Sequence, residues 1–319
     1  AINDLAPVEN LAYLLKYDTV YGRFAGTASA EAGALIIDGK KVPVLAEKDP
    51  ASLPWRDMGI DIVIESTGFF TSGEKAKAHL DAGAKRVVIS APAKGEGVET
   101  VMIGANDEKF DTCGPITSNA SCTTNAVAPV IGILDEAIGI ERALLNTTHA
   151  YTASQGIVDG IAPDDFRRGR AGAANLGPSS TGAAKAMALV YPQFKGKFDG
   201  IAVRVPVPSG SIADVTFVAK RATSVEEVNE YLRKAATTKR WKRVFSVSDE
   251  PLVSSDILNT PYGSIADLTM TRVVGDLPAP GEARQAGGTL VKVLAWYDNE
   301  MGYVHTLIEH VLEVAKRIK

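Results

Sequence analysis

The sequence predicts an α/β protein in two parts, an alternating strand–helix region followed by a strand-rich region. Between residues 61 and 93, two short apolar runs, DIVIESTG and RVVISAPA, enclose a segment of helix formers. Apolar strands on both sides of a helix are typical of a parallel sheet covered on both faces. In the second half, runs such as FDGIAVRVPV, ADVTFVAK and TLVKVLAWYD have few helices between them. That half therefore favours a largely antiparallel sheet.

The first predicted elements precede these runs. The stretch ENLAYLLKY, residues 9–17, has apolar residues at helical spacing. The stretch ALIIDGKKVPVL, residues 34–45, predicts two short strands around Asp38-Gly39, a pair typical of a tight hairpin turn. A helix and a hairpin are therefore expected before the first buried strand.

Residues 72–85 predict the helix between the two apolar runs. Ser72 is a suitable N-cap, and Gly83 is a suitable stop because glycine adopts the backbone conformation that ends helices. The strands on either side end in small residues, at 66–68 and 90–93. Open α/β sheets bind ligands at the carboxyl ends of their strands, so we expect a ligand groove there.

The length, composition and net charge of the chain narrow the class of protein. The 319 residues are 45% hydrophobic and 23% charged, an ordinary globular composition that allows two domains. With a net charge of −4, the chain lacks the excess of basic residues that is typical of a dedicated nucleic-acid-binding protein. No apolar run reaches the length of a membrane span, and no secretory leader is evident. With only two cysteines, we expect no metal site and a cytoplasmic location.

The stretch SNASCTTN, residues 118–125, contains one of these cysteines in an unusual setting. Cys122 has small polar neighbours, whereas a cysteine kept for packing usually has apolar ones. The positive end of a helix dipole depresses a thiol pKa, so Cys122 is a candidate nucleophile, with a structural cysteine as the alternative. A helix is predicted directly after it, with an apolar face formed by Val127, Val130, Ile131, Leu134, Ala137 and Ile138.

Of the four histidines, His149 is the best candidate for a base. His79, His305 and His310 lie within predicted helices, whereas His149 follows an apolar run and precedes small polar residues. A histidine beside a cysteine nucleophile activates it by taking its proton. From the residues alone, a structural histidine stays equally open.

Residues 151–182 predict one long loop, because Gly, Asp, Pro, Arg, Ser and Thr dominate and no period persists. Such a loop in a compact protein is either functional or disordered. Thr181-Gly182 opens a predicted helix, and helix N-termini bind phosphate. Arg204 lies inside an apolar run, so it needs an acidic partner or an anionic ligand. Two further hydroxyls are anion-ligand candidates, those of Thr152 and Ser154.

Five motifs occur in order along the chain: SNASCTTN, HAYTASQ, PSSTGAAKA, VRVP and WYDNEMGY. Together they closely resemble the phosphorylating glyceraldehyde-3-phosphate dehydrogenases, and the resemblance runs through the whole sequence. It implies a Rossmann-type dinucleotide-binding domain from residues 1–121 and 299–319. It implies an α+β catalytic domain with a mostly antiparallel sheet from residues 122–298, and a homotetramer with the loop 151–182 at its centre.

The implied activity is that of a glycolytic oxidoreductase. Glyceraldehyde 3-phosphate and inorganic phosphate would give 1,3-bisphosphoglycerate, with a hydride passing to NAD. By this resemblance Cys122 attacks the aldehyde, and His149 activates the thiol. Substrate and phosphate binding would fall to Ser121, Thr123, Thr152, Ser154, Thr181, Gly182 and Arg204. Cofactor binding would fall to Asp4, Thr67, Gly68, Ser90, Asn299 and Tyr303.

Several positions depart from the family pattern. Its Gly-rich, phosphate-binding turn would lie about 25 residues before Asp4, outside the given sequence. Ala126 replaces a second cysteine, and residues 276–288 exceed the usual short turn. A shortened, non-catalytic homologue that acts as a binding protein is therefore one alternative. The other is erythrose-4-phosphate dehydrogenase, against which Thr152 argues.

NAD is the expected cofactor, because the carboxylate of Asp4 would repel the 2′-phosphate of NADP. NADP stays open, since the long loop also affects this choice in related enzymes. Around Asp159-Gly160 the loop departs from the Leu-Pro pair associated with strict NAD users.

Overall fold

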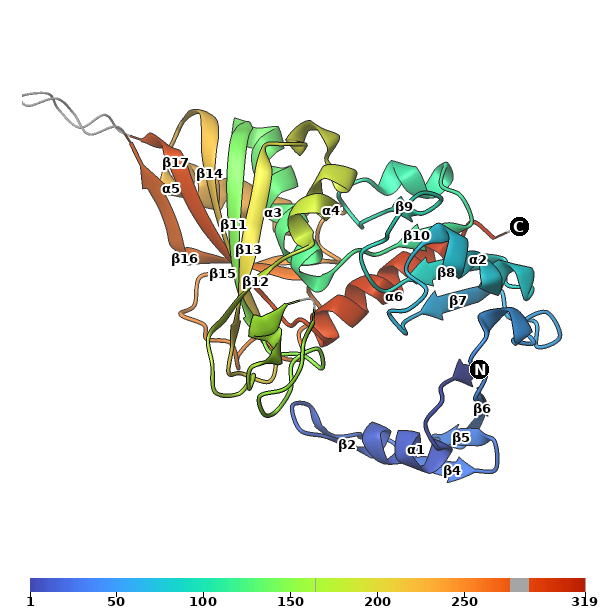
Figure 1. Ribbon diagram of the computed structural model, residues 1–319. Coiled ribbons are helices and arrows are strands. Elements are labelled where there is room, and N and C mark those ends of the chain that lie inside the picture. The colour runs from blue at the N-terminus through green and yellow to red at the C-terminus, as the bar shows by residue number, and fades with distance from the viewer. Residues whose placement is uncertain (164, 276–286, 319) are drawn as a thin grey trace, which may run out of the picture.

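The structure is a computed structural model that describes residues 1–163, 165–275 and 287–318. Figure 1 shows an N-terminal segment set apart from a small parallel sheet, which in turn lies beside a large sheet. Within the described ranges, every helix is too short or too polar to span a bilayer. The predicted long turn at 276–288 falls almost entirely outside the described residues.

Residues 1–45 form what we call the N-terminal lobe. Helix α1, Val8–Lys16, packs on a four-stranded sheet with the order β1–β6–β5–β4. Asp38 and Gly39 take positive φ values of 47° and 75° in the turn between β5 and β6, as a tight hairpin requires. The predicted helix and hairpin are therefore confirmed. The strands are β1 (Ile2–Asn3), β2 (Tyr17–Asp18), β3 (Gly22–Arg23), β4 (Ala28–Glu31), β5 (Ala34–Ile37) and β6 (Lys40–Leu45).

The second sheet is parallel throughout, with the order β7–β8–β10–β9. Helix α2, Gly73–Asp81, connects β7 to β8. The Oγ of Ser72 accepts a hydrogen bond from the N–H of Lys75, and Gly83 beyond the helix has a φ of 114°. The predicted strand–helix–strand unit and its cap are confirmed. The strands are β7 (Ile62–Glu65), β8 (Arg86–Ile89), β9 (Glu99–Thr100) and β10 (Ile116–Ser118).

The large sheet has seven strands in the order β12–β13–β11–β14–β17–β16–β15. Only the β11–β13 and β15–β16 pairs are parallel, so the predicted mostly antiparallel sheet is confirmed. Strand β12 lies in the predicted loop 151–182 and forms because it pairs with the edge of β13. The strands are β11 (Ile140–Ala150), β12 (Gly177–Ser180), β13 (Phe198–Val205), β14 (Ser211–Thr223), β15 (Phe245–Ser248), β16 (Ser264–Val274) and β17 (Gly288–Tyr297).

Helix α3, Cys122–Ile138, lies within the main hydrophobic core. The predicted apolar face is buried against the large sheet, with Val130, Ile131 and Leu134 at 0% exposure. Burial of this face is what holds the start of α3 against the sheet. The remaining helices are α4 (Ala183–Val190), α5 (Val225–Ala236) and α6 (Met301–Ala315).

The C-terminal helix returns to the parallel sheet. Nε2 of His310 in α6 is 2.8 Å from Oγ1 of Thr117 in β10. Arg317, just after α6, pairs with Asp111 at 2.6 Å. These contacts join the two ends of the predicted dinucleotide-binding domain; its boundaries at 121 and 299 stay a prediction.

Candidate active site

Helix α3 begins at Cys122. Ser121 is its N-cap, in an extended conformation, and its Oγ accepts a hydrogen bond from the N–H of Thr124 at 3.1 Å. The helix starts there because the side-chain oxygen satisfies a backbone donor that has no partner within the helix. The thiol therefore lies at the positive end of a helix dipole, where the sequence predicts it.

His149 lies near the end of β11 and reaches this thiol. Its Nε2 is 3.5 Å from the Sγ of Cys122, although the two residues are 27 positions apart. Strand β11 lies between β13 and β14, so the His149 residue is only 4% exposed. Packing of α3 on the sheet thus brings the predicted nucleophile and base together.

Arg204 lies on the other side of the imidazole. Strand β13 pairs with β11 so that Arg204 is opposite His149. Its Nη1 is 2.8 Å from Nδ1 of His149 and 3.1 Å from the carbonyl oxygen of Ala150. Among the described residues, the ionisable groups that act on this guanidinium are those of Arg168, Cys122 and Tyr297, and none is a carboxylate. Arg204 therefore suits an anionic ligand, the second of the two possibilities expected for it.

Burial and a nearby cation act against the expected thiolate–imidazolium pair in this state. Burial raises the pKa of the Cys122 thiol, although hydrogen bonds with Thr123 and the Arg204 cation act to lower it. Burial, followed by the Arg204 cation, lowers the pKa of His149 to about 4. At neutral pH both groups are thus uncharged. The reason is that His149 is buried and Cys122 is partly buried, and the guanidinium repels a second positive charge on the imidazole.

Tyr297 supports the pair from the interior. Its Oη is 2.9 Å from Oγ1 of Thr123 and 2.7 Å from Oγ1 of Thr147. Its ring packs edge-on against His149, with 5.8 Å between centroids. Tyr297 lies in the motif WYDNEMGY, but no role was predicted for it. The available signal was a tyrosine in an apolar strand, whose buried hydroxyl needs a partner.

The hydroxyl of Thr123 is buried, so the phosphate role predicted for this residue would fall to its backbone N–H in the first turn of α3. The residue is 4% exposed, and its hydroxyl is bonded to Tyr297 rather than directed to the surface. The side chain points inward because the first turn of α3 packs on β17. Thr123 therefore supports the site, and of the hydroxyls around Cys122 only that of Ser121 remains a ligand candidate.

The other predicted anion ligands lie in two places. Thr152 and Ser154 follow β11 directly, and their hydroxyls are 2.9 Å apart. Thr181 and Gly182 precede α4, and Oγ1 of Thr181 accepts a hydrogen bond from a backbone N–H of that helix.

The pairing of β12 with β13 separates Thr181 and Gly182 from the Arg204 guanidinium. Gly177 is opposite Arg204 in the pairing of β12 with β13. Thr181 is four residues further on, or about 13 Å along an extended strand. The structure thus offers two anion positions rather than one.

Four predicted cofactor residues lie directly after strands: Asp4 after β1, Thr67 and Gly68 after β7, and Ser90 after β8. The carboxylate of Asp4 is exposed, and Oδ1 accepts a hydrogen bond from the N–H of Ala6 at 2.8 Å. Its other oxygen is available to ribose hydroxyls. The N–H of Thr67 donates to Glu65, which fixes the turn at the end of β7. These positions fit the adenosine end of a dinucleotide.

Asn299 and Tyr303 lie at the other end of the predicted groove, next to the thiol. Oδ1 of Asn299 accepts hydrogen bonds from Gly210 N–H at 3.1 Å and Ser211 Oγ at 2.9 Å. Its amide NH₂ is therefore oriented as the donor for a ligand. Oη of Tyr303 donates to the carbonyl of Ala120 at 3.1 Å, two residues before Cys122. An amide donor beside the nucleophile fits the carboxamide of a nicotinamide ring.

Comparison with known proteins agrees with this geometry. The family model of the glyceraldehyde 3-phosphate dehydrogenase C-terminal domain matches residues 121–299, and that of the NAD binding domain matches residues 1–73. The chain is 47% identical over 317 residues to glyceraldehyde-3-phosphate dehydrogenase of Zymomonas mobilis, covering 99% of this chain and 90% of the relative. It is 46% identical to that of Clostridium pasteurianum over 320 residues, covering 99% and 91%. It is 47% identical to that of Mycobacterium tuberculosis H37Rv over 320 residues, covering 100% and 90%. The chain belongs to the glyceraldehyde-3-phosphate dehydrogenase family.

Proposed function

We propose that this protein oxidises glyceraldehyde 3-phosphate to 1,3-bisphosphoglycerate, with inorganic phosphate as co-substrate and NAD as cofactor. The observation that carries the proposal is the 3.5 Å separation of Cys122 Sγ and His149 Nε2 at a helix N-terminus. The alternatives, erythrose-4-phosphate dehydrogenase and a non-catalytic binding protein, are not favoured. The chain retains the nucleophile, the base and Thr152, and its relatives named above are glyceraldehyde-3-phosphate dehydrogenases.

The neutral resting pair determines the first step. As Sγ bonds to the aldehyde carbon, the thiol proton passes to Nε2 of His149, and the carbonyl electron pair moves to oxygen. The backbone N–H of Cys122 and the new imidazolium stabilise this oxyanion. When the carbonyl re-forms, a hydride leaves the carbon, and NAD, when bound, supplies the acceptor for it. The product on the enzyme is a Cys122 thioester.

Phosphate then completes the reaction. A phosphate oxygen attacks the thioester carbon, the carbon–sulfur bond breaks, and Sγ leaves with the electron pair. The imidazolium of His149 lies next to the departing thiolate and can return its proton. The separate anion positions suit a reaction with two phosphates. Arg204, Thr152 and Ser154 would hold the phosphate of the substrate, and Ser121, Thr181 and Gly182 the attacking phosphate.

Substitution of the nucleophile tests the proposal. Cys122→Ser should nearly abolish NADH formation from glyceraldehyde 3-phosphate while NAD binding is retained, and His149→Asn should leave a weaker enzyme. Cys113→Ser is the matched control, because among the described residues its thiol has one hydrogen-bond partner, the Phe110 carbonyl at 3.6 Å. A Cys122→Ser variant with wild-type activity would refute the assignment. Steady-state rates with NAD and NADP, each with and without phosphate, decide whether NADP also serves.

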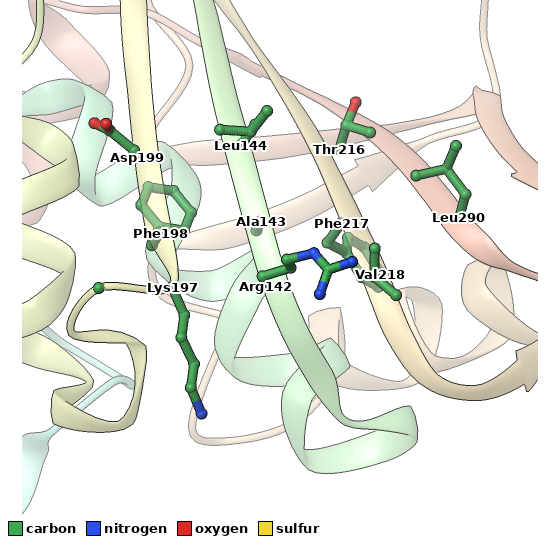
Figure 2. Close-up of a pocket in the computed structure, with 11 residues that line it drawn as sticks. Arg142, Ala143, Leu144, Lys197, Phe198, Asp199, Thr216, Phe217, Val218 and Leu290 are labelled. Carbon is green, nitrogen blue, oxygen red and sulfur yellow. The ribbon is translucent and has the colours of Figure 1, made fainter.

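The outer face of the large sheet supports a homotetramer. Helix α3 packs on one face of this sheet, and the other face presents Leu144 and Ile201, 65% and 52% exposed. Figure 2 shows Leu144, Thr216 and Leu290 from neighbouring strands around a pocket of about 470 Å³. A second copy of this chain suits the face, because a two-fold contact sets apolar strands against their own equivalents. Charged side chains of both signs border the pocket: Arg142, Lys197 and Asp199.

The long loop has a second apolar surface. Ile157, Ile161 and Phe166 are 89%, 98% and 82% exposed. Two different self-contacts on one subunit generate a tetramer with three perpendicular two-fold axes. In sedimentation, Leu144→Asp and Ile161→Asp should each reduce a tetramer to dimers, whereas Leu14→Asp, at an exposed position of α1, should not. A wild-type protein that sediments as a monomer would exclude this assembly.

A cytoplasmic location is part of the proposal. Both cysteines are free thiols, and a reducing compartment keeps the nucleophile in its active form. Loss of activity on mild oxidation, with recovery after a thiol reductant, is the expected result.

A further inference from the structure

One side chain connects the N-terminal lobe to the loops of the large sheet. The Oη of Tyr21, between β2 and β3, donates to the carboxylate of Asp298, 2.8 Å from Oδ1 and 3.0 Å from Oδ2. Among the described residues, Tyr21 is the one side chain of the lobe that hydrogen-bonds to that sheet or its loops. In Figure 1, the end of the lobe that carries β2 points toward these loops.

Asp298 is a well-supported acceptor. It is 1% exposed and lies between β17 and α6, directly before Asn299. Two of its donors are the backbone N–H groups at the start of α6, so the carboxylate organises the loop that carries Asn299. Besides Tyr21, it accepts hydrogen bonds from Ser209 Oγ at 3.3 Å, Asn259 N at 2.8 Å, Glu300 N at 2.9 Å and Met301 N at 3.0 Å.

The phenol of Tyr21 remains a donor across the physiological pH range. Burial, and then the neighbouring acids Asp298 and Glu300, raise its pKa, although a hydrogen bond with Ser209 acts to lower it. Since the phenol keeps its proton, the bond joins a neutral donor to a carboxylate. Hydrogen bonds to charged groups are stronger than those between neutral groups.

We propose that Tyr21 is a positioning residue for the cofactor. It holds the N-terminal lobe, which carries Asp4, at the separation from Asn299 at which one dinucleotide reaches both. This inference rests on the proposed function. A ligand held at two ends binds tightly only when both ends are in place beforehand, because otherwise its binding energy is partly used to fix the protein. Without Tyr21, the lobe would have to be positioned anew for each binding event.

Tyr21→Phe tests this with little disturbance. The variant keeps the ring and removes one hydroxyl, while Asp298 keeps its four other donors. Calorimetric titration should show about a tenfold rise in the Kd for NAD, equal to about 1.4 kcal/mol. ADP-ribose lacks the nicotinamide ring, so its Kd should be unchanged. Tyr13→Phe is the matched control, because Tyr13 lies in α1 of the same lobe and is 59% exposed.

The ratio of the two affinities distinguishes positioning from a structural role. A general loosening of the lobe would weaken ADP-ribose and NAD alike, and that result would overturn the inference. An unchanged Kd for NAD in Tyr21→Phe would also overturn it and leave the proposed function standing. A wild-type protein that binds neither ligand would remove the proposed function itself.

Discussion

Arg204→Gln should change the proton affinity of both groups in the catalytic pair. The substitution removes the cation that lies 2.8 Å from Nδ1 of His149 and leaves a neutral side chain of similar reach. The pKa of His149 is about 4, with burial as the larger cause and Arg204 as the second. An ordinary imidazole titrates near pH 6.5, so loss of the cation should raise this pKa by about one unit, or about 1.4 kcal/mol.

The thiol should respond in the same direction. The Arg204 cation lowers the pKa of Cys122 against the effect of burial, so its removal should raise that pKa as well. A charge pair about 4 Å apart near a protein surface is worth about 4 kcal/mol, which sets a ceiling on either change. Because Arg204 is partly open to solvent, the smaller change of about one pKa unit applies to both the thiol and the imidazole. The alkylation rate of Cys122 at neutral pH should therefore fall about tenfold.

Iodoacetamide labelling against pH, measured peptide by peptide, provides the assay. Cys113 in the same sample is the internal control, and Arg170→Gln, in the exposed loop, is the matched variant. An NMR titration of the His149 imidazole supplies the second pKa independently. The reasoning fails if the Cys122 profile moves to lower pH in Arg204→Gln. It fails equally if the imidazole still titrates near pH 4, its pKa in the native arrangement.

Three further substitutions probe the buried polar groups. Tyr297→Phe removes a hydrogen-bond partner from the hydroxyls of Thr123 and Thr147, of which Thr147 keeps the carbonyl of Ile212 at 3.2 Å. Urea unfolding should therefore show a loss of about 1–3 kcal/mol, and kcat should fall more than KM rises. Burial lowers the pKa of His310 to about 4; the unfolded chain therefore binds the proton first, and stability present above pH 6.5 is lost as pH falls. His310→Gln should remove about 2 kcal/mol of the loss in unfolding free energy between about pH 7.5 and pH 5. Glu65→Gln places an amide NH₂ among donors from Thr67 and His79. Thermal unfolding should therefore show a clear loss of stability that Glu74→Gln, at an exposed position of α2, does not.

Each of these results has a contrary outcome. Equal stability of Tyr297→Phe and wild type would mean that the hydroxyls find other partners. If the unfolding free energies of His310→Gln and wild type depend on pH in the same way, groups other than His310 cause the loss of stability at low pH. If Glu65→Gln is as stable as wild type, the groups around the Glu65 carboxylate are not all hydrogen-bond donors.

Short-range chemistry determined the local elements of this protein. Ser121 caps α3 through the N–H of Thr124 three residues later, and Ser72 caps α2 in the same way. The Asp38-Gly39 pair selects the hairpin turn through its own backbone preferences. Such features depend only on neighbours within one turn, so the sequence alone was sufficient to predict them. The same holds for the N-terminal position of Cys122.

The sequence also indicated which residues belong to the site, but it did not show that these residues lie next to one another. His149 and Arg204 are 55 positions apart and become neighbours through the pairing of β11 with β13. Strand β12 forms for the same reason, within a segment whose local pattern indicates a loop. Pairing between distant strands depends on the whole sheet, and no window of sequence contains it.

The charge state of the site was decided by tertiary structure alone. By itself the sequence indicated a candidate nucleophile at a helix start, a candidate histidine base, and an arginine that needs an acidic partner or an anionic ligand. It favoured an ion pair, because a helix dipole and an imidazolium both stabilise a thiolate. The fold buries both partners and sets the guanidinium against the imidazole, so the resting pair is neutral. Desolvation and the distances between charges exist only once the chain has folded, and these two quantities determine a pKa.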